Sequence, residues 1–524
     1  MPLDVPTVSY ALPEGVDPPG LLAYLDKRFP VIAEPGVSRS YTVLDTADRR
    51  LRAAGVDLDL ETGRGGPRLV LREAGGRAPL VAEVRRPRRN RYLLRDVPAG
   101  PVRERLAPIV EMRALLPLAN VQVGAQLVRV LNADDKTVAR VSLATPVALV
   151  GGGDAGALQL TPRVVVTGVL GYPKPLGRVT AAVRRGPKGG LVDAPASVAD
   201  EAIAAIGGDP EGIRTKVLVD LRPDQRTDRS AVAVLCDLAG MVEANLPGTL
   251  ADLDTEFLHD LRVAVRRSRS VLRELKGAFP PEPLGTQRDA LRWIQAVTGP
   301  TRDLDVQLLD WDHLVSGIPV ERHAALAPVR ALLVRHRAAA FRALRRELRG
   351  PANRQAWDGY RAFLAGDLGP TRDRPDAKRP IVAVAGRRIR KVYRRMLVMG
   401  AAIDLASPAE QLHELRKRGK ELRYLLELFG GMWPRAVVKP MVRSLKELQD
   451  MLGVHQDRQV QATYLRGLAG ELAISTGGPA ALLALGVLVD RLDAEQREAR
   501  DAFAARFAAF AAADQQALVA KVFS

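Results

Sequence analysis

Two patterns of apolar residues divide the chain, and the change between them falls near residue 225. In the first part, short apolar runs between Gly- and Pro-rich stretches predict antiparallel strands, for example at 37–44, 68–72, 127–131 and 138–143. From Ala231 onward, apolar residues recur with the 3.6-residue period of a helix between short Pro or Gly breaks. We therefore predict a multidomain α+β chain, in which an antiparallel β-rich domain at 1–220 precedes an all-α domain at 228–524.

The helical region contains an internal repeat. HDLRVAVRRSRSVLRELKGAFP at His259 recurs as HELRKRGKELRYLLELFGGMWP at His413, an offset of 154 residues. The same offset, without gaps, aligns Arg292 with Lys446 and Asp303 with Asp457. A register held over this length indicates a duplication. We predict two related units at 228–378 and 380–524, each a bundle of about four helices.

Each repeat begins with a helix whose basic residues share one face. At 100° per residue, five residues of the first copy fall within an arc of about 80°: His259, Arg262, Arg266, Arg269 and Arg273. The second copy keeps His413, Arg416, Lys420 and Arg423 and places Glu427 at the last position. Solvated helices usually alternate Glu with Lys, because like charges one turn apart repel. The duplicated stripe therefore favours an anion-binding face over an ordinary solvated one.

The two histidines lack the neighbours that a metal site needs. Neither His259 nor His413 has a second histidine or a carboxylate at metal-ligand spacing, so no metal or other cofactor is predicted. Contact with phosphate or positioning of the helix are the alternatives. Asp303 and Asp457 each follow their histidine by 44 residues, and each is a candidate to orient that histidine or an arginine.

Charge narrows the class of partner. The 524 residues include 78 Lys and Arg against 60 Asp and Glu, for a formal net charge of +18, which favours nucleic acid, polyphosphate or a lipid surface. Aromatic residues make up 4 % of the chain, which argues against a base-stacking surface.

Cysteine content and hydropathy indicate a compartment. Cys236 is the only cysteine, which excludes an intrachain disulfide and a Cys-based zinc site and fits a reducing environment. The N-terminal residues lack a signal-peptide pattern, and the longest near-apolar run, 477–489, is shorter than the roughly 20 residues that span a bilayer. We expect a soluble cytoplasmic protein with no membrane partner.

The repeated motifs resemble the CHAD family, the conserved histidine α-helical domain. HDLRVAVRRSR and HELRKRGKELRY resemble the family signature, and RDLDV at Arg302 and LQDMLGVHQD at Leu448 resemble its later-helix motifs. The resemblance covers roughly 228–524. It implies two pseudo-symmetric four-helix bundles that face each other across a positively charged cavity, and it implies that this cavity binds inorganic polyphosphate.

The same resemblance implies which side chains contact the ligand. In the first repeat they are His259, Arg262, Arg266, Arg269 and Arg273, and in the second His413, Arg416, Lys420 and Arg423. Arg292 and Lys446 occupy matching places on a later helix and are predicted to line the same cavity. Three further residues form a basic stripe before the second motif: Arg387, Lys391 and Arg394.

The N-terminal part resembles the CYTH, or triphosphate-tunnel, fold through YTVLDTADRRLRAAGVDLDLE at Tyr41. The chemistry of that family is missing. Its Glu-x-Glu-x-Lys motif would fall at Val5, Thr7 and Ser9, two of its arginines are replaced by Asp59 and Glu61, and only Arg72 and Arg129 resemble surviving basic positions. Without carboxylates to hold magnesium, phosphoryl transfer lacks its electrophile. We therefore predict a degenerate domain and no enzymatic activity.

The leading hypothesis is thus an inorganic polyphosphate-binding protein, targeted to polyphosphate granules. One alternative is a metal-dependent triphosphatase or polyphosphate-processing enzyme that uses the N-terminal fold. A second alternative is a nucleic-acid-binding protein, since the same arginines could neutralise DNA or RNA phosphates. The shortage of aromatic residues and the absence of a recognition-helix pattern count against it.

Overall fold

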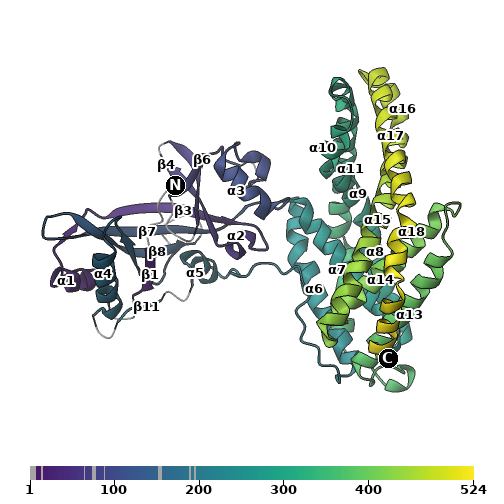
Figure 1. Ribbon diagram of the computed structural model, residues 1–524, viewed down its shortest axis with the longest axis horizontal. Helices are drawn as coiled ribbons and strands as arrows, with labels where there is room; N and C mark the ends of the chain where they lie inside the picture. The colour runs from purple at the N-terminus through teal and green to yellow at the C-terminus, as the bar shows by residue number, and fades with distance from the viewer. Residues whose placement is uncertain are drawn as a thin grey trace. The chain divides into compact units, whose positions relative to one another are not determined.

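The computed structural model describes residues 7–12, 16–63, 65–73, 78–87, 89–150, 156–187, 190–193 and 196–523. It divides into two compact units, 1–215 and 216–524, and the ribbon in Figure 1 shows one as a sheet with helices and the other as helices alone. The predicted α+β class, with an antiparallel sheet before a helical region, is confirmed.

The N-terminal unit is built on one antiparallel sheet. Its described strands are β1 Thr7–Ala11, β2 Val31–Ala33, β3 Val37–Asp45, β4 Val56–Gly63, β5 Gly66–Glu73, β6 Leu80–Glu83, β7 Leu116–Leu131, β8 Thr137–Leu149, β9 Ala157–Gln159, β10 Arg163–Gly168 and β11 Val192–Asp193. They follow the order β11-β1-β10-β8-β7-β3-β4-β5-β6, with β2 also on β7 and β9 also on β8. The four sequence runs predicted as strands lie within β3, β5, β7 and β8.

Short helices complete this unit: α1 Pro18–Asp26, α2 Arg50–Ala53, α3 Pro101–Val110, α4 Pro173–Arg185 and α5 Val198–Ala205. Side chains alternate between the two faces of a strand, and β4 shows the result. Leu58 packs in the apolar cluster that also contains Leu106 of α3. Asp59 and Glu61 therefore belong to the opposite face, where both are largely buried.

The helical unit contains two series of helices. The first is α6 Thr227–Ala251, α7 Thr255–Glu274, α8 Pro281–Val297, α9 Gly299–Leu309, α10 Trp311–Ser316, α11 Ala327–Arg349 and α12 Pro351–Ala365. The second is α13 Ile381–Ala401, α14 Ala409–Phe429, α15 Arg435–Gly467, α16 Ala469–Ala473, α17 Gly478–Asp501, α18 Phe503–Phe510 and α19 Ala513–Val522. Several of these are short, so each repeat is more finely divided than a four-helix description suggests.

The first three helices of the two series begin at equivalent positions. α6 and α13, α7 and α14, and α8 and α15 each start 154 residues apart, which is the offset of the sequence repeat. The copies differ further along, because the first breaks into α8 and α9 at Thr298, whereas α15 continues without a break. The duplication is therefore visible in the backbone as well as in the motifs.

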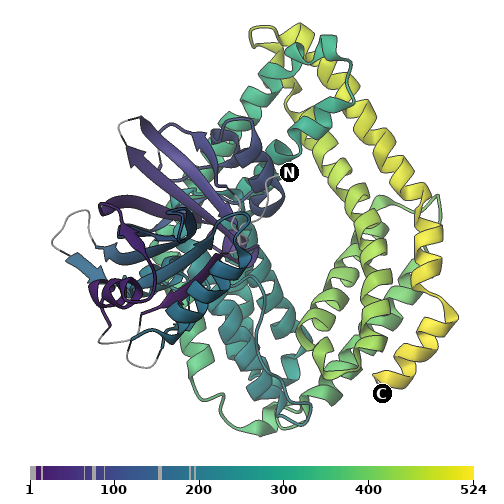
Figure 2. The same ribbon diagram turned by 60° about the vertical axis from the view of Figure 1, so that its left-hand side comes forward.

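Two large apolar clusters hold the helical unit together. One joins α6, α7 and α8 to α13, α14 and α15, and the other joins α9, α10 and α11 to α15, α16 and α17. Figure 2 shows these helices from a second direction, with α17 running toward the C-terminal helices. Among described helices, α6 alone has the length and hydropathy of a membrane span, but Val234, Leu235 and Leu238 are fully buried in the first cluster.

Candidate functional site

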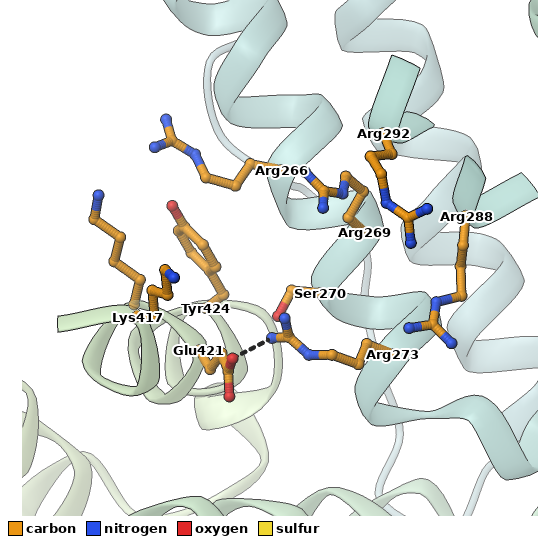
Figure 3. A pocket seen from close by; sticks show the side chains of 10 residues that line it. Arg266, Arg269, Ser270, Arg273, Arg288, Arg292, Lys417, Glu421 and Tyr424 are labelled. Carbon is orange, nitrogen blue, oxygen red and sulfur yellow. Dashed lines mark ion pairs between the residues drawn. The ribbon is translucent and has the colours of Figure 1, made fainter. Parts of the chain in front are cut away.

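A basic cavity of about 300 Å³ lies between α7, α8 and α14 (Figure 3). Seven cationic side chains and one carboxylate line it, together with Ser270 and Tyr424: Arg266, Arg269, Arg273, Arg288, Arg292, Lys417, Lys420 and Glu421. We call it the first cavity. Its lining comes from both repeats, since α7 and α8 belong to the first copy and α14 to the second.

The amphipathic pattern of α7 places three arginines in this cavity. Asp254 caps the helix, because its Oδ1 accepts hydrogen bonds from the backbone N–H groups of Glu256 and Phe257 at 2.9 and 3.1 Å. From this start, Leu261, Val265 and Leu272 face the apolar core. The arginines at 266, 269 and 273 are spaced three and four residues apart and share the neighbouring face.

Burial, together with repulsion between these cations, lowers two pKa values in the first cavity. Burial first, and then Arg292, Arg273, Arg288 and Arg266, lower the pKa of Arg269. Burial, followed by Arg416 and Arg266, lowers the pKa of Lys420 to about 7. Charge of one sign thus accumulates in a partly buried space, and a bound anion would relieve it.

Arg266 adds a donor that has no acceptor. Its Nε atom is buried and makes no hydrogen bond to the described residues. Buried donors in folded proteins are usually satisfied, and an exception calls for a ligand, an ion or water. The first cavity therefore combines unbalanced charge with an unsatisfied guanidinium N–H.

A second cavity of about 220 Å³ adjoins the first and shares Arg273, Arg288 and Glu421 with it. Arg273 Nη2 lies 3.0 Å from Glu421 Oε1, the ion pair drawn in Figure 3. The two Glu421 oxygens also accept hydrogen bonds from Arg418 at 2.7 and 2.8 Å. The remaining lining is Glu274, Lys276, Arg388, Lys391, Val392, Arg395 and Arg418. An ion pair thus stands at the common wall of two basic cavities.

The structure brings six of the predicted residues to these cavities. Arg266, Arg269, Arg273, Arg292 and Lys420 line the first cavity, and Lys391 lines the second. They come from four helices and from both repeats, as the duplicated stripe predicted. Contact between these residues and a ligand stays a prediction.

Arg262 and Arg416, which are equivalent in the two repeats, line neither cavity and instead connect helices. Arg262 Nη1 donates hydrogen bonds to the Gln295 carbonyl at 2.8 Å and to Thr298 Oγ1 at 2.7 Å. Burial lowers its pKa to about 10. Arg416 Nη2 lies 3.1 Å from Asp457 Oδ1. Both arginines therefore position α7 and α14 against the following helices.

The histidines also lie outside the first cavity. His413 Nδ1 is 2.5 Å from Gln456 Oε1, and His413 lines a separate cavity of about 470 Å³ with Glu410, Gln459 and Tyr464. His259 is partly buried on α7. Of the two aspartates predicted to orient a histidine or an arginine, Asp457 pairs with an arginine. Helix positioning is the alternative that this geometry favours for His413.

Four further predicted residues do not line either cavity. Arg387 Nη2 pairs with Asp376 at 2.6 Å, and Arg423 Nε lies 3.3 Å from Glu427. Arg394 on α13 and Lys446 on α15 are exposed. The basic face of α13 is displaced by one residue from the predicted stripe, because Arg388 and Arg395 accompany Lys391 in the second cavity.

Sequence reasoning missed several lining residues. Arg288 precedes Arg292 by one helical turn and could have been found by extending that spacing backward along α8. Lys417 and Arg418 follow the stripe residue Arg416 directly, but a 100° step places them away from its face. Lys417 lines the first cavity and Arg418 the second, so the lining that α14 contributes spans a wider arc than the stripe alone indicates.

In the N-terminal unit, the two reversed charges are neutralised inside the protein. Arg39 lies 3.2 Å from both Asp59 and Glu61, Arg68 lies 2.8 Å from Glu61, and Arg72 pairs with both acids. Burial raises the pKa of Asp59 to about 6. Arg72 therefore faces carboxylates rather than open space.

The other positions assigned to the tunnel motif are Val5, Thr7, Ser9 and Arg129. Val5 lies outside the described residues, and Thr7 and Ser9 belong to β1. Arg129 Nε lies 3.1 Å from Glu34. Within the described part of the chain, no three His, Cys, Asp or Glu side chains are grouped so that they could hold a metal ion.

The helical part of the chain is similar to known proteins. The chain is similar to the crystal structure of the CHAD domain from the plant Ricinus communis, with 24 % identity and a TM-score of 0.49, over 57 % of this chain and 96 % of that one. It is also similar to PptA from Streptomyces chartreusis, with 21 % identity and a TM-score of 0.42, over 54 % and 99 %. No curated protein matches it. The CHAD family model matches residues 233–466, and this part of the chain, which holds α7, α8 and α14, is a CHAD domain.

Proposed function

We propose that the helical unit binds inorganic polyphosphate in the first and second cavities. The observation that carries this proposal is the lining of the first cavity, where seven cations surround one carboxylate. Guanidinium groups bind phosphoryl oxygens through two parallel hydrogen bonds, and Lys supplies a point charge. A repeating polyanion would satisfy the Arg266 donor and offset the burial and the repulsion that together lower the pKa of Lys420.

The shape of the site favours a linear phosphate chain over nucleic acid. The first and second cavities share a wall. Together they form a continuous basic lining that includes arginines and lysines of both repeats. Tyr424 is the aromatic residue of the first cavity; it is 4 % exposed, and Arg423 lies over its ring at 5.6 Å. Among the described lining residues, none therefore presents an exposed aromatic ring on which a nucleobase could stack. Such stacking is a main source of affinity for single-stranded nucleic acid.

For the N-terminal unit we propose a role without phosphoryl transfer. Asp59 and Glu61 occupy places where a triphosphate site needs cations, and Arg39, Arg68 and Arg72 neutralise them. The enzyme alternative requires that this unit release phosphate from a metal-bound triphosphate. In cells, we propose that the binding unit directs the protein to polyphosphate granules.

Isothermal titration of the full chain with polyphosphate of defined length tests the binding proposal, with a competing single-stranded RNA of matched charge. Saturable binding that RNA displaces poorly is the expected result. Equal displacement by RNA would favour the nucleic-acid alternative. Absence of binding at low salt would overturn both. A tagged protein that stays dispersed in cells rich in granules would overturn the proposed location.

A further inference from the structure

A third basic cavity lies in the N-terminal unit, in the segment between β6 and α3. It has a volume of about 790 Å³ and is lined by residues 83–87, 89, 91–93, 95–98 and 103. Six of these are arginines, namely Arg85, Arg86, Arg89, Arg91, Arg95 and Arg103, against the two carboxylates Glu83 and Asp96. We call it the arginine pocket. Its size is within the usual range for small-molecule sites.

The positive charge of the arginine pocket is not neutralised by its own acids. Asp96 Oδ2 accepts a hydrogen bond from the Leu93 N–H at 2.9 Å and so serves the turn at residues 93–97. Four of the arginines form no ion pair with a described carboxylate: Arg85, Arg86, Arg95 and Arg103. Arg105, two residues after Arg103 and outside the pocket, shows the contrast because it pairs with Glu73. The pocket thus keeps cations available for an anion.

Tyr92 supplies a second, independent sign of a ligand. Its side chain is 2 % exposed, yet its hydroxyl has no hydrogen-bond partner. Backbone hydrogen bonds of 2.9 and 2.8 Å to Leu115 hold this residue in place, and its ring packs with Leu58 and Leu106. Arg86 lies near enough to oppose the effect of burial, which raises the pKa of Tyr92. A fixed, unsatisfied donor therefore lines the same cavity as the arginines.

The arginine pocket is distinct from the site that a triphosphate tunnel would use. Tyr92 belongs to the apolar cluster under α3 that also contains Leu58 of β4. Asp59 and Glu61 alternate with Leu58 along β4 and so belong to the other face of the sheet. The neutralised cluster around Asp59 therefore has no part in this pocket.

We propose that the arginine pocket binds a short linear phosphate chain. The arginines would bind phosphoryl oxygens in pairs of hydrogen bonds, and the Tyr92 hydroxyl would donate to an oxygen at the buried end of the pocket. Tyr92 is the aromatic residue of the lining and its ring is buried, so the pocket recognises phosphate rather than a base. This phosphate chain can be an inorganic oligophosphate or the phosphate tail of a nucleotide.

Isothermal titration with tripolyphosphate, ATP and adenosine, without metal, tests this proposal on the full chain. The starting protein carries Arg266→Ala and Lys420→Ala, so that the first cavity contributes little. Tripolyphosphate should still bind at one site. Arg86→Ala with Arg95→Ala should weaken that binding roughly a hundredfold, and Tyr92→Phe roughly threefold to tenfold. The matched control is Arg140→Ala with Arg178→Ala, two exposed arginines of the same unit outside the pocket.

Thermal unfolding separates binding from folding. Tyr92→Phe removes a hydroxyl that has no partner, so the melting temperature should not fall while affinity does. If ATP competes as well as tripolyphosphate does, the result supports recognition of the phosphate chain. Competition by adenosine overturns the proposal. Loss of all tripolyphosphate binding in the starting protein, or no response to the pocket variants, also overturns it. Titration of the protein that keeps Arg266 and Lys420 with long polyphosphate tests the proposed helical site separately.

Discussion

Arg266 of α7 and Lys420 of α14 occupy equivalent positions in the two repeats and line one cavity, close enough for Arg266 to help lower the pKa of Lys420. Each is the fourth residue after a helix-connecting arginine, Arg262 or Arg416. The duplication has therefore brought two copies of one position into the lining of a single basic cavity.

Replacing Arg266 and Lys420 together should weaken polyphosphate binding strongly and leave folding intact. We expect Arg266→Ala with Lys420→Ala to weaken polyphosphate binding at least about a hundredfold, since a hydrogen bond to a charged group contributes roughly 1.5–3 kcal/mol. The melting temperature should hold or rise, because a repulsion is removed. Arg345→Ala with Lys439→Ala, at exposed positions away from the cavities, is the matched control. Unchanged affinity would sink the shared-cavity proposal, and a melting temperature lowered as by a core change would indicate a structural role.

Affinity should depend steeply on salt. Binding of cations to a polyanion releases counterions, so the logarithm of the association constant falls with the logarithm of salt concentration in proportion to the phosphates neutralised. Arg269→Ala should reduce this slope by about one. Titrations from low to physiological ionic strength measure it. A flat response would mean that few lining cations touch the ligand.

Lys420 should make binding depend on pH. Its pKa is about 7 in the free protein, and a bound phosphate chain favours the charged form and raises that pKa. Binding therefore takes up protons from about pH 7 upward, and affinity should fall as pH rises through this window. Titration in buffers of different ionisation enthalpy measures the uptake. Lys420→Arg should abolish the part due to Lys420, and identical uptake in this variant would show that Lys420 is not the source of the protons.

The carboxylate at the common wall should oppose binding. Glu421→Gln removes the one negative charge of the first cavity and releases Arg273 and Arg418. We expect roughly threefold to tenfold tighter polyphosphate binding, together with a lower melting temperature because a buried pairing is lost. Glu447→Gln is the control, since its partners Arg443 and Arg506 line neither cavity. Weaker binding by Glu421→Gln would show that Glu421 positions the arginines rather than repelling the ligand.

The N-terminal unit should not hydrolyse ATP or tripolyphosphate with magnesium or manganese. Thr7 and Ser9 cannot replace the missing carboxylates, and Asp59 and Glu61 reverse two phosphate-binding charges. Phosphate release by the full chain measures this. Metal-dependent release that Arg72→Ala with Arg129→Ala abolishes would promote the enzyme alternative. Binding of tripolyphosphate without release is compatible with the arginine pocket.

Helical periodicity predicted four of the seven cations that line the first cavity, but not the choice among neighbouring arginines. The spacing of Arg266, Arg269 and Arg273 predicts a shared face, and the face exists. The same arithmetic cannot distinguish Arg262, which reaches the carbonyl of Gln295, from residues that reach the cavity. That distinction depends on how closely α8 packs on α7. On α13, a one-residue difference in helix rotation exchanges Arg387 for Arg388.

The cluster around Glu61 shows a different limit. The sequence predicted reversed charges at Asp59 and Glu61, and both acids lie on β4. Their neutralisation required the strand register, because Glu61 stands opposite Arg68 on β5 and opposite Tyr41 on β3. Arg39 precedes Tyr41 by two residues and so shares its face. Residues far apart in the sequence became neighbours through pairing that no local pattern encodes.

The ion pair between Arg273 and Glu421 has a consequence for ligands of different length. A short chain that fills only the first cavity leaves this pair in place. In the proposed binding mode, a longer chain that continues into the second cavity would exchange Glu421 for one of its own phosphates on Arg273, and it would then also meet Lys391, Arg388 and Arg395. Affinity would then rise in a step at the length that spans the wall, so that the protein would discriminate long polymers from their breakdown products.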